Sequence, residues 1–198
     1  MRKIEKSEIK KTAWIMAENF CDYPLYKIFF PNDEKRLKQT FYFFWMRMYT
    51  RRNFSYVSDD MSLVVSFQKP EDKLTSSLGM WLNPTLFFGG LFTVPFSALK
   101  LANEYGKFAN QYQEKFYNPH TDCCIQAICV DKKSRGNGEL FEVLKELEDG
   151  RPIFFETHTE ENVQLYKLMG AEICAEGSWH GVSHYVMKKR GKYLTYIK

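Results

Sequence analysis

The chain has 198 residues, a length that suits one compact unit with a sizeable hydrophobic core. Its 44% hydrophobic and 17% aromatic residues exclude a disordered chain. The formal net charge of +4 comes with only two basic clusters, at Lys132 and at Lys188, so we expect no nucleic-acid binding.

No segment is long and apolar enough to cross a membrane, and the charged start lacks the apolar core of a signal peptide. We therefore expect a cytoplasmic protein without a membrane partner. The five cysteines are an odd number and have no metal-type spacing to the histidines, so we expect reduced thiols and no metal site.

Two helices are predicted at the start. Apolar residues recur at helical spacing from Ile9 to Phe20, and Tyr23-Pro24 then breaks that helix. Asn32 or Asp33 caps a second helix that carries Leu37 and Phe41. Residues 54–57 and 63–67 read as two strands, paired through the turn at 58–60.

An insertion at about residues 69–117 departs from strand patterning. Residues 74–81, 87–90 and 98–116 are predicted to be mainly helical. A compact domain usually spends few residues between strands, so this aromatic-rich segment is either a lid over a pocket or a helical cover on a sheet face.

The central pattern begins with a buried strand at 125–130 and continues with a turn that holds Gly136 and Gly138. Leu140, Val143, Leu144 and Leu147 then follow at helical spacing. Glycines allow close backbone approach, and free N–H groups at a helix start favour negative charge, so the turn suits a pyrophosphate. An ordinary tight turn with a solvated basic flank is the alternative.

A second strand at 153–157 is followed by a helix that starts at Thr159 or Glu160 and ends at Gly170. We expect Asn162, Leu165, Tyr166 and Met169 to share one face of this helix.

These motifs resemble the GCN5-related N-acetyltransferases. The family signature Gln/Arg-x-x-Gly-x-Gly/Ala is matched by Lys133-Ser-Arg-Gly136-Asn-Gly138, and the later Asn-x-x-x-Tyr-x-x-x-Gly pattern by Asn162 through Gly170. Lys133 replaces the usual Gln or Arg, and Ala171 replaces the usual aromatic residue. Lys keeps the charge of Arg but not its planar fork.

The resemblance implies an α/β (α+β) fold: a central mixed, splayed β-sheet flanked by helices. It implies one domain over residues 1–198, with an acceptor-side half at 1–117 and an acetyl-CoA-binding half at 118–190. Acetyl-CoA would be the co-substrate, with pantetheine lying in the gap between the strands at 125–130 and 153–157 like an added strand. The implied cofactor-binding residues are Ile128, Cys129, Val130, Lys133, Ser134, Arg135, Gly136, Asn137, Gly138, Glu139, Asn162 and Tyr166.

Two residues are the predicted catalytic groups. In the family the tyrosine that matches Tyr166 protonates the departing thiolate, whereas a buried core tyrosine is the structural alternative. Only about 1 in 2,500 lysine-like amines is neutral at pH 7, so a base is needed, and Glu156 is our first candidate. His120, Asp122 and His158 are further candidates.

The leading hypothesis is therefore an N-acetyltransferase that passes an acetyl group directly to an amine of a small molecule or peptide in a ternary complex. Cys129 as a covalent carrier is disfavoured because no base is paired with it. A non-catalytic acyl-CoA-binding or sensing module is the alternative from another class. The acceptor, the acyl chain and the oligomeric state stay open, with a homodimer among the options.

Overall fold

The structure is a computed structural model that describes residues 1–50, 55–72, 94–136 and 138–190, with the backbone alone at 44–50. All seven strands of the described chain form one mixed sheet in the order β1-β2-β3-β4-β5-β7-β6. The strands are β1 (Arg2–Lys3), β2 (Ser55–Val57), β3 (Leu63–Gln68), β4 (Cys123–Val130), β5 (Ile153–Thr157), β6 (Ala171–Trp179) and β7 (Val182–Lys189).

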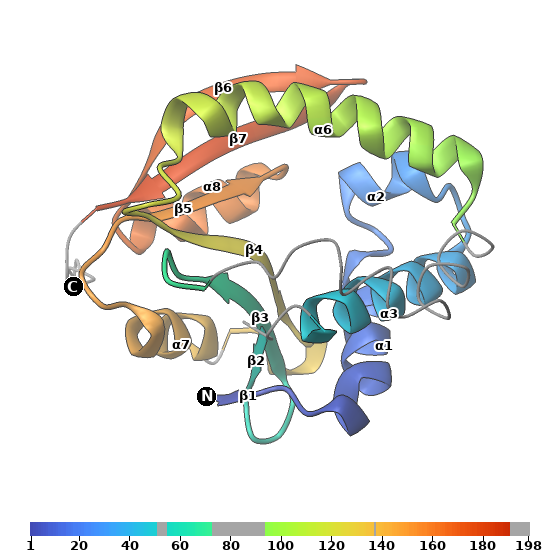
Figure 1. Ribbon diagram of the computed structural model, residues 1–198, viewed down its shortest axis with the longest axis horizontal. Helices are drawn as coiled ribbons and strands as arrows, with labels where there is room; N and C mark the ends of the chain where they lie inside the picture. The colour runs from blue at the N-terminus through green and yellow to red at the C-terminus, as the bar shows by residue number, and fades with distance from the viewer. Residues whose placement is uncertain (51–54, 73–93, 137, 191–198) are drawn as a thin grey trace.

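The described α-helices are α1 (Ile9–Phe20), α2 (Pro24–Phe29), α3 (Glu34–Thr50), α6 (Phe96–Phe116), α7 (Glu139–Leu147) and α8 (Glu160–Leu168). Short 3-10 turns, η1 (Lys6–Glu8) and η2 (Lys132–Ser134), precede α1 and α7. Figure 1 shows the helices arranged around the sheet, with α6 running along the hairpin of β6 and β7.

Two hydrophobic cores lie on the two faces of the sheet. On one face α1 and α3 bury Met16, Ala17 and Leu37 against Val64 of β3. On the other face α7 and α8 bury Leu144 and Val163 against the strands. Since β3 is covered on both faces, it reads as a nearly continuous apolar run rather than an alternating one.

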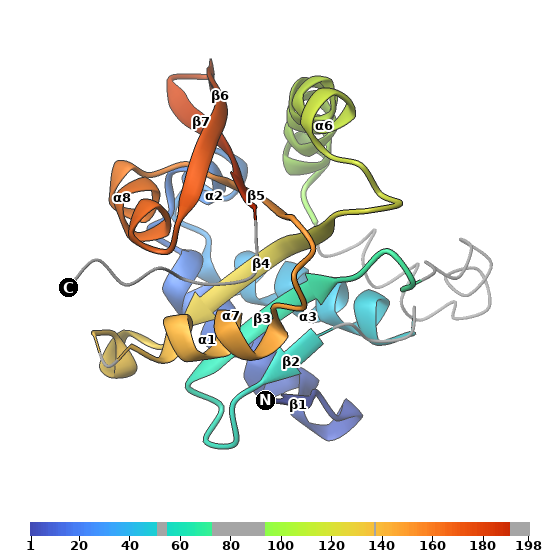
Figure 2. The same cartoon turned by 90° about the vertical axis from the view of Figure 1, so that its left-hand side faces the viewer.

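Helices α6 and α8 lie on opposite sides of the strands β5, β7 and β6, as Figure 2 shows. The side chains of β5 alternate between them: Phe155 meets Tyr166 of α8, whereas Glu156 meets Gln113 of α6. Successive side chains of a strand point to opposite faces. Each side chain of β5 therefore lies either on the face covered by α6 or on the face covered by α8.

The predicted strands, the fold class and the helix at 98–116 are confirmed by these elements. Residues 74–81 and 87–90, also assigned from the sequence, lie outside the described residues.

Three local features of the structure add to these predictions. Pro24 does not only end α1, because it also occupies the first turn of α2, where its missing N–H costs no hydrogen bond. Leu165 is 38% exposed, and the apolar side chains buried by α8 and its C-cap are those of Val163, Tyr166 and Met169. The two residues of β1 carry no strand pattern in the sequence.

No helix in the described part of the chain has the length and apolarity that a membrane crossing requires.

Candidate active site

The gap between β4 and β5 is the central feature of the site. The two strands pair in parallel at only three positions, the last of which joins Ile125 to Phe155. Beyond that position β4 continues to Val130, while β5 continues to Thr157 along β7. The sheet is therefore splayed, and Ile128, Cys129 and Val130 lie on the stretch of β4 that pairs with β3 but not with β5.

The turn after β4 has the backbone that a close ligand approach requires. Gly136 and Gly138 have φ values of +89° and +78°, in the region that favours glycine. A Cβ atom at either position would meet no atom within 4 Å, so the space above both glycines is open. Gly138 is the N-cap of α7, and its carbonyl oxygen accepts from the N–H groups of Phe141 and Glu142.

The side chains of the turn make contacts of their own. Arg135 donates from Nε to the carbonyl oxygen of Val130 at 3.3 Å and from Nη2 to Asn19 Oδ1 at 3.0 Å. Glu139 accepts from the Ser62 hydroxyl at 2.8 Å, which ties the start of α7 to the β2–β3 turn. These contacts hold the turn beside the open part of β4.

The remaining predicted residues of this turn differ in exposure. Lys133 is exposed and Ser134 is partly buried, with its N–H donating to the Asp131 carbonyl oxygen at 2.9 Å. Asn137 lies outside the described residues.

Helix α8 carries Asn162 and Tyr166 beside the same gap. The Thr159 hydroxyl caps the helix by accepting from the Asn162 N–H at 3.3 Å. Asn162 Nδ2 also donates to Thr157 Oγ1 at 3.1 Å. Tyr166 is 7% exposed and packs edge-on against Phe155. Burial raises the pKa of the Tyr166 hydroxyl, and Tyr23 raises it further by a smaller amount.

Glu156 faces the opposite side of β5. Its side chain is 16% exposed, and both carboxylate oxygens lie 3.4 Å from Gln113 Nε2 of α6. Burial raises the pKa of the Glu156 carboxyl to about 7, although the Gln113 hydrogen bond works in the other direction. A carboxyl group that titrates near neutral pH is suited to accepting and releasing a proton.

A hydrogen-bonded cluster surrounds the end of β5. The Tyr23 hydroxyl lies 3.1 Å from Thr157 Oγ1 and 3.2 Å from His158 Nδ1, and it accepts from the His158 backbone N–H at 2.9 Å. On the far side of the His158 ring, Nε2 lies 2.7 Å from the Tyr105 hydroxyl of α6. That hydroxyl also lies 3.2 Å from Nδ1 of His184 on β7.

Burial keeps both histidines of this cluster neutral. It lowers the pKa of His158 to about 3, with a further contribution from His184, and it lowers the pKa of His184 to about 4. The two rings therefore act as hydrogen-bonding groups rather than as cations at neutral pH.

The other two candidate bases lie elsewhere. Asp122 and His120 precede Cys123, the position where β4 and β5 are paired, so they are at the closed end of the gap. Asp122 is buried and forms an ion pair of 2.6 Å with Lys188. His120 is exposed, and its N–H donates to Asn118 Oδ1. The geometry therefore brings Glu156 and His158 together and separates them from Asp122 and His120.

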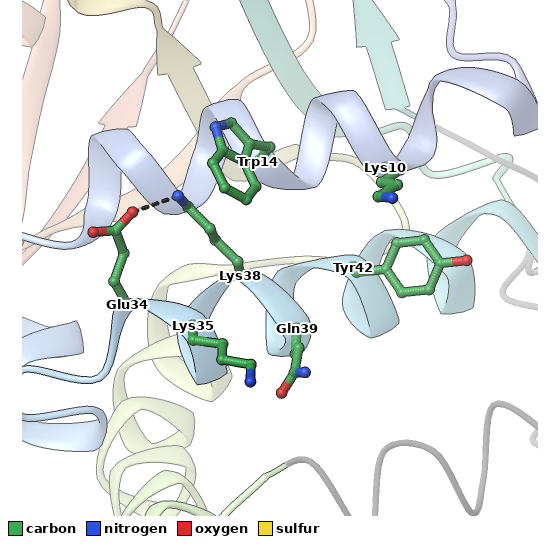
Figure 3. A pocket seen from close by; sticks show the side chains of 7 residues that line it. All are labelled: Lys10, Trp14, Glu34, Lys35, Lys38, Gln39 and Tyr42. Carbon is green, nitrogen blue, oxygen red and sulfur yellow. Dashed lines mark ion pairs between the residues drawn. The ribbon is translucent and has the colours of Figure 1, made fainter.

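A groove of about 680 Å³ lies between α1 and α3, with Trp14, Lys38 and Tyr42 on its walls (Figure 3). The Lys38 ammonium lies 3.1 Å from the centre of the Trp14 ring. None of the predicted site residues lines this groove. Within the described ranges no group of His, Cys, Asp or Glu side chains is arranged to hold a metal ion.

Solved acetyltransferase structures share this architecture. A Corynebacterium glutamicum protein described as histone acetyltransferase HPA2 and related acetyltransferase is 12% identical, with a TM-score of 0.62 over 98% of this chain and 96% of its own. An N-acetyltransferase from Staphylococcus aureus Mu50 is also 12% identical, with a TM-score of 0.50 over 94% of this chain and 98% of its own. The chain has the GCN5-related N-acetyltransferase fold, as its two motifs predicted.

Sequence comparison alone finds no such likeness. No protein-family model matches the chain, and no curated protein sequence matches it.

Sequence reasoning missed Tyr23, Tyr105 and His184 as site residues. They lie just before α2, on α6 and on β7, and only tertiary packing brings them together. The one signal available was the run of strand alternation that puts His184 on the same face as Val186, the residue paired with Glu156.

Proposed function

We propose that the protein is an acetyl-CoA-dependent N-acetyltransferase that transfers an acetyl group directly to an amine in a ternary complex. The observation that carries this proposal is the early end of β4–β5 pairing at Ile125 and Phe155, beside a turn with two left-handed glycines. An unpaired strand edge suits the amides of a pantetheine arm, and a glycine turn at a helix start suits its diphosphate.

The chemistry of the described residues suits acetyl-CoA. Open space above Gly136 and Gly138 allows an anion to reach the backbone N–H groups at the start of α7. Main-chain groups of Ile128 and Val130 would bind the arm, and an N–H near Cys129 would polarise a carbonyl oxygen. When bound, acetyl-CoA supplies an acetyl group activated as a thioester.

Glu156 would remove a proton from the acceptor. A primary amine with a pKa of about 10.4 is protonated at pH 7, which costs roughly 4.6 kcal/mol before the nitrogen can attack. With its pKa near 7, the Glu156 carboxyl is a base matched to neutral conditions. The proton lost by the amine would go to Glu156, directly or through a water molecule.

Tyr166 would stabilise the leaving thiolate from the opposite face of β5. Tyr166 lies one helical turn after Asn162 on α8, and Asn162 Nδ2 donates to Thr157 Oγ1 at the end of β5. Because β5 separates Glu156 from Tyr166, a thioester lying in the plane of the gap would have the base on one side and the hydroxyl donor on the other.

Direct transfer is favoured over a cysteine intermediate. Cys129 is 5% exposed, and burial raises the pKa of its thiol to about 12, although Arg135 opposes the shift. A thiol that stays protonated is a poor nucleophile.

Two measurements on the purified protein test the proposal. Titration calorimetry should show binding of acetyl-CoA and of free coenzyme A, and a thiol-release assay should show turnover with members of a library of small-molecule and peptide amines. Absence of coenzyme A binding would overturn the assignment of the gap. Tight binding without transfer to any amine would instead support the acyl-CoA-sensing alternative.

A further inference from the structure

His184 occupies the most enclosed position in the cluster around Glu156. Its side chain is fully buried, with the rings of Phe108 and Tyr112 of α6 centred 5.3 and 5.1 Å away. Its Nδ1 faces the Tyr105 hydroxyl, but its buried Nε2 has no hydrogen-bond partner among the described residues. Glu156 Oε1 lies 3.8 Å from this nitrogen.

One direction of the hydrogen bonds can be followed through the cluster from its far end. In one assignment that these distances allow, Thr157 Oγ1 accepts from Asn162 Nδ2 and donates its own proton to the Tyr23 hydroxyl at 3.1 Å. Tyr23 also accepts the His158 backbone N–H. Its own proton is therefore left for His158 Nδ1 at 3.2 Å.

The same assignment of donors and acceptors extends to the rings of His158 and His184. His158 is neutral and accepts at Nδ1, so its proton is on Nε2 and is donated to the Tyr105 hydroxyl at 2.7 Å. Tyr105 then donates to His184 Nδ1 at 3.2 Å. In this assignment the proton of the neutral His184 ring is on Nε2, the atom that faces Glu156. In this arrangement every hydroxyl and ring proton of the hydrogen-bonded chain has an acceptor except the His184 Nε2–H, whose nearest carboxylate oxygen is Glu156 Oε1 at 3.8 Å.

We propose that His184 is a positioning residue for Glu156, with its Nε2–H directed at the carboxylate by a chain of hydrogen bonds that begins at Asn162. The inference rests on the proposed function, in which Glu156 takes a proton from the acceptor amine. The separation of 3.8 Å is longer than a hydrogen bond, and contacts of this kind commonly shorten when the substrate is bound. This chain of hydrogen bonds passes around the end of β5 and so connects the two faces of that strand.

The groups around Glu156 determine how strongly the His184 N–H donor affects the ionisation of the Glu156 carboxyl. The polar and titratable groups that face it are His184 from β7, Gln113 and Tyr105 from α6, and the Cys124 thiol from β4. None of these groups carries a positive charge at neutral pH, so N–H donation is the means by which they favour the carboxylate. Loss of the His184 donor should therefore favour the protonated acid.

The pH profile of kcat/KM distinguishes positioning from simple packing. His184→Phe fills the aromatic site without a donor, and the acid limb of its profile should move to higher pH by about one unit. His184→Gln carries an N–H at the same reach and should keep the limb of the unaltered enzyme. If the His184→Phe limb does not move, or if both variants move it equally, His184 does not position the base.

A second readout needs neither turnover nor a variant that folds. Long-range proton–nitrogen NMR spectra of the unaltered protein, labelled with ¹⁵N histidine, report which ring nitrogen carries the proton. We expect His184 and His158 both to be neutral and protonated on Nε2. A proton on Nδ1 of His184 would overturn the proposal, whereas failure of the protein to transfer acetyl groups would overturn only the proposed function.

Discussion

Replacing Glu156 by glutamine should change how the stability of the protein depends on pH. Burial raises the pKa of this carboxyl from 4.5 to about 7, so between these values the native state holds a proton that the unfolded state releases. The resulting stability is present below the unfolded pKa and is lost as the pH rises through 7. Only 16% of the side chain is exposed, so solvent screening removes little of this energy.

For one group with these two pKa values, linkage gives about 2.5 kcal/mol between pH 5 and pH 8. We therefore expect the difference in free energy of unfolding, wild type minus Glu156→Gln, to be larger at pH 5 than at pH 8 by about that amount. Urea unfolding of the two proteins at both pH values measures it. Glutamine keeps the shape of the side chain, so packing against Gln113 changes little.

The two histidines also make stability depend on pH, so the effect of Glu156 has to be measured as a difference between two proteins. Because their folded pKa values are lowered to about 3 and about 4, His158 and His184 contribute stability that is present above the unfolded pKa and is lost as the pH falls. This effect opposes that of Glu156, but it is present in both proteins and cancels in the difference. Glu172→Gln, at an exposed position of β6, is the matched control. If the wild-type minus Glu156→Gln difference in free energy of unfolding changes with pH no more than the difference for the control, the reasoning is refuted.

Further substitutions test the remaining parts of the site and fold. Tyr166→Phe should lower kcat by about 10²-fold or more while acetyl-CoA affinity in calorimetry stays within a few-fold of wild type, and unchanged turnover would remove the tyrosine from the mechanism. Gly136→Val should abolish measurable acetyl-CoA binding because φ is +89° there, and normal affinity would refute the assignment of the turn. Gly177→Ala should cost about 1–3 kcal/mol of stability because its Cβ would lie 2.2 Å from the Tyr112 hydroxyl, whereas Gly106→Ala in the open part of α6 should not destabilise.

Much of the fold could be predicted from local sequence because its elements have strong local patterns. The apolar run at 63–67 and the strand predicted at 153–157 each match one observed strand, and the helical period at 9–20 matches α1. Pro24 misled the prediction because proline both ends one helix and begins the next. The two residues of β1 have no pattern of their own and are strand only because they pair with β2.

The residues of the candidate site are of two kinds, those that belong to short sequence motifs and those that only tertiary packing brings together. Gly136, Gly138 and Tyr166 belong to short motifs whose spacing is fixed along the chain, and the structure places them beside the gap. Tyr105 and His184 are 79 residues apart, and their meeting depends on how α6 packs on β7. Nothing local encodes that packing, and the strand alternation that puts His184 on the face of Val186 becomes informative only once the pairing of Val186 with Glu156 is known.

Burial also changes the role proposed for Tyr166. An ordinary tyrosine near pKa 10 and an alkyl thiol near 8.5 already make full proton transfer to the thiolate uphill by about 2 kcal/mol. Burial raises the pKa of Tyr166 further, which makes the transfer still less favourable. A hydrogen bond to the developing negative charge needs no transfer and gains from the same burial, because the low dielectric strengthens it. The proposed mechanism therefore assigns Tyr166 the role of a hydrogen-bond donor and leaves proton removal to Glu156 on the other face of β5.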